Sequence, residues 1–306
     1  MPLADTDMYK QHFGLQDKPF NLIPDPDYLY LSPKHKIGLS LLEYGLMETA
    51  AGLTVITGEV GAGKTTLIRK LMRRIDYSEL TVGVINNTSS FHDHLMSWVS
   101  SAYSLPHEGK DTITLFREFQ QFLIDQYSQG KRTVLIVDEA QNLDGGALEE
   151  LRMLTNINAD RDQLLQIVLV GQPELLDLLS RPELAQIAQR VSVEYHLEPL
   201  GFDEVVHYIQ HRLEVAGGDP DIFETDAVKA IYYFSGGVPR LVNTLCDYAL
   251  VHAYASDKQH VDFAVAVDVK KGRKIGGINR FVKDEQQVEL IRQQLLADQG
   301  VDLANL

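Results

Sequence analysis

The chain has 306 residues, of which 44% are hydrophobic and 23% charged, so it exceeds one ordinary domain and can build a packed core. Its formal net charge of −15 argues against nucleic acid as the main partner, because phosphate contacts need clustered lysine and arginine. The single cysteine, Cys246, predicts a reduced cytoplasmic setting, and we expect it to be a small core residue. The chain shows no leader and no apolar run long enough to cross a bilayer, which predicts a soluble chain.

Residues 1–50 form a lead-in segment that is rich in prolines and aromatic residues. The prolines prevent a long helix and the aromatic side chains need burial, so we expect an extended segment packed on the core. Ser32 and Pro33 then mark the start of a helix, as its N-cap and first-turn residue. Tyr30, Pro33 and His35 are either contacts of a nucleotide base or plain packing residues.

Residues 58–65 match the phosphate-loop pattern G-x-x-x-x-G-K-T, between an apolar run and a helix-like stretch. The glycines let the backbone curl and point N–H groups inward, and the following helix adds the positive end of its dipole. Lys64 is expected to reach the β- and γ-phosphates, and Thr65 to offer its hydroxyl to Mg²⁺. The predicted nucleotide-binding residues here are Gly58, Glu59, Val60, Gly61, Ala62, Gly63, Lys64, Thr65 and Thr66.

Strand-like apolar runs alternate with helical patterns over residues 51–198. This alternation is typical of a parallel sheet with crossover helices, so it predicts an α/β nucleotide-binding domain. The expected strands are 53–57, 82–86, 133–137, 167–170 and 191–197, and the expected helices are 91–104, 112–129, 146–156 and 173–180. The last strand alternates in polarity and is therefore expected at an edge of the sheet.

Two acids follow the third expected strand directly. Asp138 is placed to hold Mg²⁺ through its water shell, and Glu139 to polarise the attacking water. Two acids after an apolar run often mark only the end of a strand, but together with a phosphate loop they predict ATP hydrolysis. Gln172, after the fourth strand, either orients water or a γ-phosphate oxygen or caps the next helix.

From residue 199 the chain is helical throughout, which predicts a small all-α lid domain over 199–270 joined by a hinge at 198–201. Its expected helices are 203–216, 224–235, 239–256 and a weaker element at 261–269. In the first of them Val206, Ile209 and Leu213 are expected to form the buried stripe, with His207 and His211 on the outer side. The tail, 271–306, is polar and amphipathic, either a docking helix or a frayed end.

Arginines supply the remaining candidate residues. Arg240 follows a Gly-Gly-Val-Pro turn and is expected to swing onto the γ-phosphate and sense nucleotide state, the alternative being a surface charge. Arg190 precedes the fifth strand and is a candidate arginine finger that faces a neighbouring subunit. Arg181 competes for that role, and either arginine is otherwise a salt-bridging surface residue.

The set of motifs resembles a known family. In chain order they are Tyr9, 13–15, 19–20, 58–65, 137–141, 170–175 and 236–241. Together they are similar to the ExeA-type ATPases, the general secretion pathway protein A group of the AAA+ class, over roughly residues 8–270. The resemblance implies an AAA+ core with a helical lid and ATP held between the subunits of an oligomer or ring. It also implies work on a bacterial cell-envelope assembly such as type II secretion, pilus biogenesis or polysaccharide export.

The resemblance also assigns roles to individual residues. Lys64 and Thr65 take the phosphate-loop roles, Asp138 and Glu139 the Mg²⁺ and water-activating roles, and Arg190 and Arg240 the finger and lid-sensor roles. Gln172 departs from the Asn, Ser or Thr that is commoner in the wider class. Secretion-type members continue into a membrane-spanning segment and a periplasmic domain, whereas this chain stops at Leu306.

The end of the chain at Leu306 leaves two interpretations: the chain is a cytoplasmic fragment, or it is a short relative that docks on its partner through the tail. In both, the chain is cytoplasmic, at most peripheral to the inner membrane, and meets the membrane only through an envelope-assembly partner. Two other functions stay open: a DNA-dependent regulator like the transposition ATPases, and a nucleotide-gated scaffold with little turnover.

Overall fold

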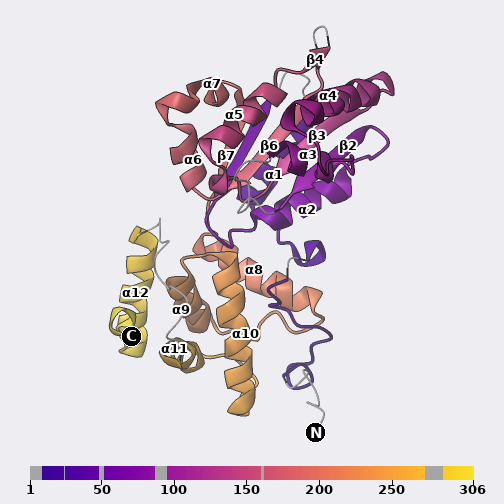
Figure 1. Ribbon diagram of the computed structural model, residues 1–306. Helices are drawn as coiled ribbons and strands as arrows, with labels where there is room; N and C mark the ends of the chain where they lie inside the picture. The colour runs from indigo at the N-terminus through magenta and orange to yellow at the C-terminus, as the bar shows by residue number, and fades with distance from the viewer. Residues whose placement is uncertain (1–8, 24, 48–51, 87–94, 160–161, 273–284) are drawn as a thin grey trace. The chain divides into compact units, whose positions relative to one another are not determined.

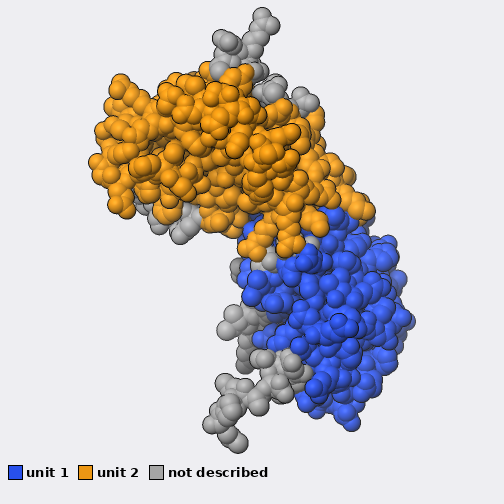
Figure 2. Space-filling view, turned by 90° about the vertical axis from the view of Figure 1, so that its right-hand side faces the viewer, with its two compact units in different colours: residues 1–32, 59–66, 198–306 blue, residues 33–58, 67–197 orange. Residues whose placement is uncertain are grey.

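The computed structural model describes residues 9–23, 25–47, 52–86, 95–159, 162–272 and 285–306 (Figure 1). The chain divides into two compact units, which Figure 2 colours separately. Unit 1 comprises residues 1–32, 59–66 and 198–306, and unit 2 comprises residues 33–58 and 67–197. Each unit therefore collects segments that are distant in the sequence.

Unit 2 is built on a five-stranded sheet with the order β2-β3-β6-β1-β7. Its strands are β1 (Leu53–Gly58), β2 (Leu80–Ile85), β3 (Arg132–Val137), β6 (Leu165–Gly171) and β7 (Val191–Leu197). All neighbouring pairs run parallel, so the carboxyl ends of the strands meet at one edge. The parallel five-stranded sheet predicted from the sequence is confirmed, and β7 lies at an edge as its alternation predicts.

Helices cover both faces of this sheet. One face packs in a core with α3 (Leu95–Ala102), α4 (Thr112–Ser128), α5 (Gly145–Leu154), α6 (Glu174–Leu179) and α7 (Ala185–Ala188). The other face carries α1 (Pro33–Met47), which comes so close that a Cβ at Gly45 would lie 2.5 Å from Thr54 Oγ1. No local sequence pattern predicts α7 or the short antiparallel pair of β4 (Asn158–Ala159) and β5 (Asp162–Gln163).

Unit 1 holds the helices α8 (Phe202–Val215), α9 (Thr225–Ser235), α10 (Pro239–Ala255), α11 (Phe263–Gly272) and α12 (Glu285–Gln299). The first three begin and end within one residue of the expected helices, and α11 begins two residues and ends three residues after the expected element at 261–269. Gly236 adopts a left-handed conformation and ends α9, and Pro239 begins α10, as their residue types indicate. Cys246 is buried in this core, where desolvation raises the pKa of its thiol.

Residues 9–23 and 25–32 pack on the helices of unit 1. They contribute a set of aromatic and aliphatic side chains to its hydrophobic core: Tyr9, Phe13, Leu15, Phe20 and Tyr28. The hydroxyl of Tyr9 donates a hydrogen bond to Asp247 Oδ1 of α10 at 2.6 Å. The aromatic residues of the lead-in segment are thus buried, with a short 3₁₀ turn at Pro26–Tyr28.

The buried face of α8 differs from the expected stripe. Val205, Tyr208, Ile209, Arg212 and Leu213 are its buried residues, and Val206 is only half-buried. A hydrophobicity pattern misses this face because Arg212 is charged, although only 7% of the residue is exposed. His207 is exposed as expected, whereas His211 is half-buried beside the Tyr30 ring.

Arg212 joins the N-terminal segment to α8. Its guanidinium donates hydrogen bonds to the carbonyls of Pro19 and Asn21 and to the Tyr208 hydroxyl. Its Cζ also lies 5.0 Å from the centroid of the Tyr28 ring and 5.6 Å from that of Tyr208. Cation–π contacts and hydrogen bonds to carbonyls stabilise a buried guanidinium.

We expect Arg212→Ala to lower the free energy of unfolding by about 3 kcal/mol, because it leaves buried carbonyls without donors and removes the ring contacts. Hydrogen exchange followed by mass spectrometry should show faster exchange in peptides covering residues 9–32. Arg117→Ala, on the exposed side of α4, is the matched control and should change neither quantity. Unchanged protection of residues 9–32 in Arg212→Ala would contradict this role.

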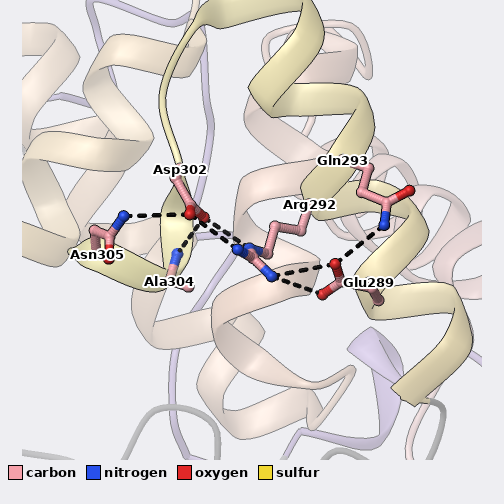
Figure 3. A network of polar contacts seen from close by, with 6 residues as sticks. All are labelled: Glu289, Arg292, Gln293, Asp302, Ala304 and Asn305. Atoms are coloured by element: carbon pink, nitrogen blue, oxygen red, sulfur yellow. Dashed lines mark hydrogen bonds and ion pairs between the residues drawn. The ribbon is translucent and has the colours of Figure 1, made fainter.

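The C-terminal segment also packs within unit 1. Ile291 and Leu295 of α12 and Leu303 of the following turn are buried in its core. Arg292 donates hydrogen bonds to both carboxylate oxygens of Asp302, at 2.7 and 2.9 Å, and pairs with Glu289 (Figure 3). These donors hold the pKa of Asp302 at about 2, so the carboxylate that closes this turn stays charged at neutral pH.

Candidate functional site

The phosphate loop begins at the carboxyl end of β1 and runs into α2 (Lys64–Arg74). Gly61 and Gly63 have φ angles of +83° and +104°, a region that favours glycine, so the loop curls as its glycines predict. At Gly58 a Cβ would lie 2.6 Å from the carbonyl oxygen of Leu197, which excludes a side chain there. Lys64 is 7% exposed and its Nζ donates a hydrogen bond to the Glu59 carbonyl at 3.0 Å.

The loop contacts the start of α10 within unit 1. The backbone N–H of Arg240 donates a hydrogen bond to the carbonyl of Gly61 at 3.2 Å. A Cβ on Gly61 would come within 2.5 Å of Arg240 Cβ, so the contact requires glycine. The Gly-Gly turn before α10 is equally close-packed, because a Cβ at Gly237 would meet the Leu200 carbonyl. Arg240 itself is exposed.

Asp138 and Glu139 follow β3 at the carboxyl edge of the sheet. Asp138 is 9% exposed, and its N–H donates to the Ile85 carbonyl of β2 at 2.8 Å. Glu139 has φ 56° and ψ 35°, a left-handed conformation that is uncommon for a residue with a side chain. Its N–H donates to Asp138 Oδ1 at 3.0 Å, so the two acids are fixed relative to each other.

Gln172 lies directly after β6, next to β3 in the sheet. Its Nε2 donates to Glu139 Oε2 at 3.2 Å. Gln141 donates to the same oxygen at 2.7 Å and accepts, through Oε1, the Gln172 backbone N–H at 3.0 Å. The sequence motifs assign Gln141 no role, although it lies two residues after Glu139 in the same motif. Asp138, Glu139, Gln141 and Gln172 thus form one cluster in unit 2.

Arg190 and Arg181 lie elsewhere in unit 2. Arg190 precedes β7, at the amino edge of the parallel sheet, and donates to the Thr155 carbonyl and Asn156 Oδ1 after α5. A strand of this length spans about 20 Å, which separates Arg190 from the acids at the opposite edge. Arg181 is exposed before the 3₁₀ turn Pro182–Leu184.

The three candidate base contacts are placed differently. His35 of α1 is buried within unit 2. Tyr30 is half-buried in unit 1, where its ring centroid lies 6.2 Å from that of Tyr208. Pro33, the first residue of α1, is exposed, and the role of all three residues toward a nucleotide stays a prediction. In the parts of the chain that the structure describes, no helix combines the length and apolarity that a bilayer span requires.

The residue chemistry fits a Mg²⁺-nucleotide. A curled glycine loop with a buried lysine suits phosphate oxygens, and Mg²⁺ needs only one or two protein oxygens besides water and phosphate. The Thr65 hydroxyl of unit 1 and the Asp138 carboxylate of unit 2 are each oxygens of the kind that Mg²⁺ binds, and residues 58–66 have the backbone N–H groups that suit phosphates. When bound, the ion would neutralise charge on the phosphates.

Comparison with known proteins agrees with this chemistry. A family model described as an AAA domain matches residues 47–179. General secretion pathway protein A of Aeromonas hydrophila is 41% identical over 263 residues, which make up 85% of this chain and 48% of that protein. The chain belongs to the ExeA-type AAA family. It spans about half the length of this curated relative.

Solved structures share the fold of this ExeA-type chain. The Aeropyrum pernix ORC2 protein, in ADPNP-ADP complexes, is 15% identical over 86% of this chain and 73% of that one, with a TM-score of 0.62. Drosophila ORC bound to DNA is 14% identical over 98% and 82%, with a TM-score of 0.64. The Thermotoga maritima RuvB branch migration motor is 19% identical over 89% and 83%, with a TM-score of 0.52. At such identities the likeness shows the fold alone, that of an AAA P-loop NTPase.

Proposed function

We propose that this ExeA-type chain binds ATP with Mg²⁺, hydrolyses it, and uses the turnover to assemble or remodel a bacterial cell-envelope complex. The observation that supports hydrolysis best is the Glu139 carboxylate, fixed at the carboxyl edge beside Asp138 by two amide donors. A carboxylate so placed is suited to accept a proton from the attacking water. The name of the Aeromonas relative supports the link to secretion.

The proposed site is shared between subunits. Arg190 lies at the amino edge of the sheet, a full strand length from the carboxyl edge where Glu139 lies, so it is poorly placed for the nucleotide of its own chain. We propose that it reaches the nucleotide of a neighbouring subunit, as an arginine finger does, with Arg240 reporting nucleotide state from the helical unit. The chain would then act at the cytoplasmic face of the inner membrane, reaching the membrane through its partner.

A complementation experiment tests the shared site. We expect phosphate release per subunit to rise with protein concentration, and Arg190→Ala to remove the rise. A mixture of Arg190→Ala and Glu139→Gln should regain turnover, because the second variant supplies Arg190 to the intact Glu139 of the first. Arg181→Ala is the matched control and should keep wild-type behaviour. A mixture as inactive as its components would contradict a finger acting between subunits.

Mass measurements and a DNA titration separate the alternatives. Molecular mass with and without ATP reports whether nucleotide drives assembly, and an assembly without phosphate release would support a nucleotide-gated scaffold. Tight, steeply salt-dependent binding to DNA in the presence of ATP would support a DNA-dependent regulator instead.

A further inference from the structure

The amide of Gln141 bridges two strand ends. Its Nε2 donates to Glu139 Oε2 at 2.7 Å, and its Oε1 accepts the N–H of Gln172 at 3.0 Å. Glu139 follows β3, and Gln172 follows β6, the neighbouring strand. A single side chain therefore connects the water-activating glutamate to the turn that begins α6.

The surroundings of Gln141 fix this bridge. A Cβ on Gly171 would come within 2.9 Å of Gln141 Oε1, so glycine at the end of β6 leaves the space that the amide occupies. The backbone between Glu139 and Gln141 is also constrained, because Glu139 is left-handed and its carbonyl accepts the Asn142 N–H at 3.0 Å. Such an uncommon backbone conformation persists only where its surroundings hold it.

We infer that Gln141 is a positioning residue for Glu139, and that its amide makes the place of the Glu139 carboxylate depend on the turn at Gly171 and Gln172. Two N–H donors from different strand ends converge on Glu139 Oε2 and set the plane of the carboxylate. A shift of the Gln172 turn is passed to Glu139 through both donors. This inference rests on the proposed hydrolysis, in which a glutamate displaced by about 1 Å loses about 100-fold in rate.

Two nearly isosteric substitutions test the bridge. Gln141→Met removes both hydrogen bonds, and Gln141→Glu keeps an acceptor for Gln172 but replaces the donor that faces Glu139. We expect both to lower kcat for ATP by about 10- to 100-fold while KM and nucleotide affinity change less than about twofold. Gln186→Met, on the exposed side of α7, is the matched control and should keep wild-type kinetics.

A double variant with Glu139→Gln tests whether Gln141 acts through Glu139. If Gln141 acts through Glu139, Gln141→Met should cause no further loss of turnover in the Glu139→Gln background. Additive losses, or an unchanged kcat in the single variants, would overturn the inference while leaving the proposed function intact. A wild-type chain without turnover, together with an equally inactive Gln186→Met control, would instead contradict the proposed function. Unfolding midpoints of all variants show whether a lost rate reflects lost folding.

Discussion

Lys64→Ala should abolish ATP binding at concentrations that saturate the wild type. Lys64 is nearly buried in the phosphate loop, where its ammonium makes a hydrogen bond to the Glu59 carbonyl within the loop itself. A charge-assisted hydrogen bond to phosphate contributes about 1.5–3 kcal/mol, so the loss of several weakens binding by about 100-fold or more. Titration with a fluorescent ATP analogue measures the change.

The same helix provides the control for this substitution. Lys70 of α2 is half-buried and lies outside the loop, so Lys70→Ala should bind nucleotide as the wild type does. Alanine favours helix at both positions, so neither change should unfold α2. Wild-type affinity in Lys64→Ala would show that the glycine loop does not hold the phosphates.

Glu139→Gln should keep ATP binding and lower the rate of phosphate release by about 100- to 10,000-fold, as the loss of a general base does. Glutamine has nearly the same shape and retains an oxygen that can accept hydrogen bonds from Gln141 and Gln172. It cannot take a proton from water. Single-turnover assays with bound ATP separate this effect from a loss of affinity.

Glu174→Gln is the matched change at the neighbouring strand end. Glu174 is exposed in the first turn of α6, two residues after Gln172, and among the described residues its side chain makes no hydrogen bond to Asp138 or Glu139. Its substitution should leave both binding and turnover unchanged. Normal phosphate release in Glu139→Gln would exclude Glu139 as the residue that activates water, whatever the loop binds.

The parallel sheet and most of its helices could be predicted from local pattern. Apart from the exposed Arg132, the residues of β1, β3 and β6 are buried on both faces of the sheet, so they are mostly apolar and indicate strands. The caps of α9 and α10 follow equally from Gly236 and Pro239. At these strands and helix ends the local preference of the residues agrees with the conformation that the fold requires.

Packing decided the features that pattern missed. Arginine is usually a surface residue, and the burial of Arg212 is explained by its contacts with Tyr208, with the Tyr28 ring and with the carbonyls of Pro19 and Asn21. Pro19, Asn21 and Tyr28 lie nearly 200 residues away along the chain, and Pro19 and Arg212 are 193 positions apart. Ile291 and Leu295 likewise indicate an amphipathic helix, while the core that covers them is set by the fold of unit 1.

The sequence by itself determined the kinds of chemical group at the site, because a glycine loop with lysine and threonine and a strand ending in two acids each carry their chemistry in adjacent residues. The tertiary structure alone decided how the groups are held: the left-handed Glu139, the Gln141 bridge to Gln172, and Arg190 at the far edge of the sheet. Hydrogen bonds between strand ends depend on which strands are neighbours. That order, β3 beside β6, is fixed by packing across the whole sheet and by no short stretch of the chain.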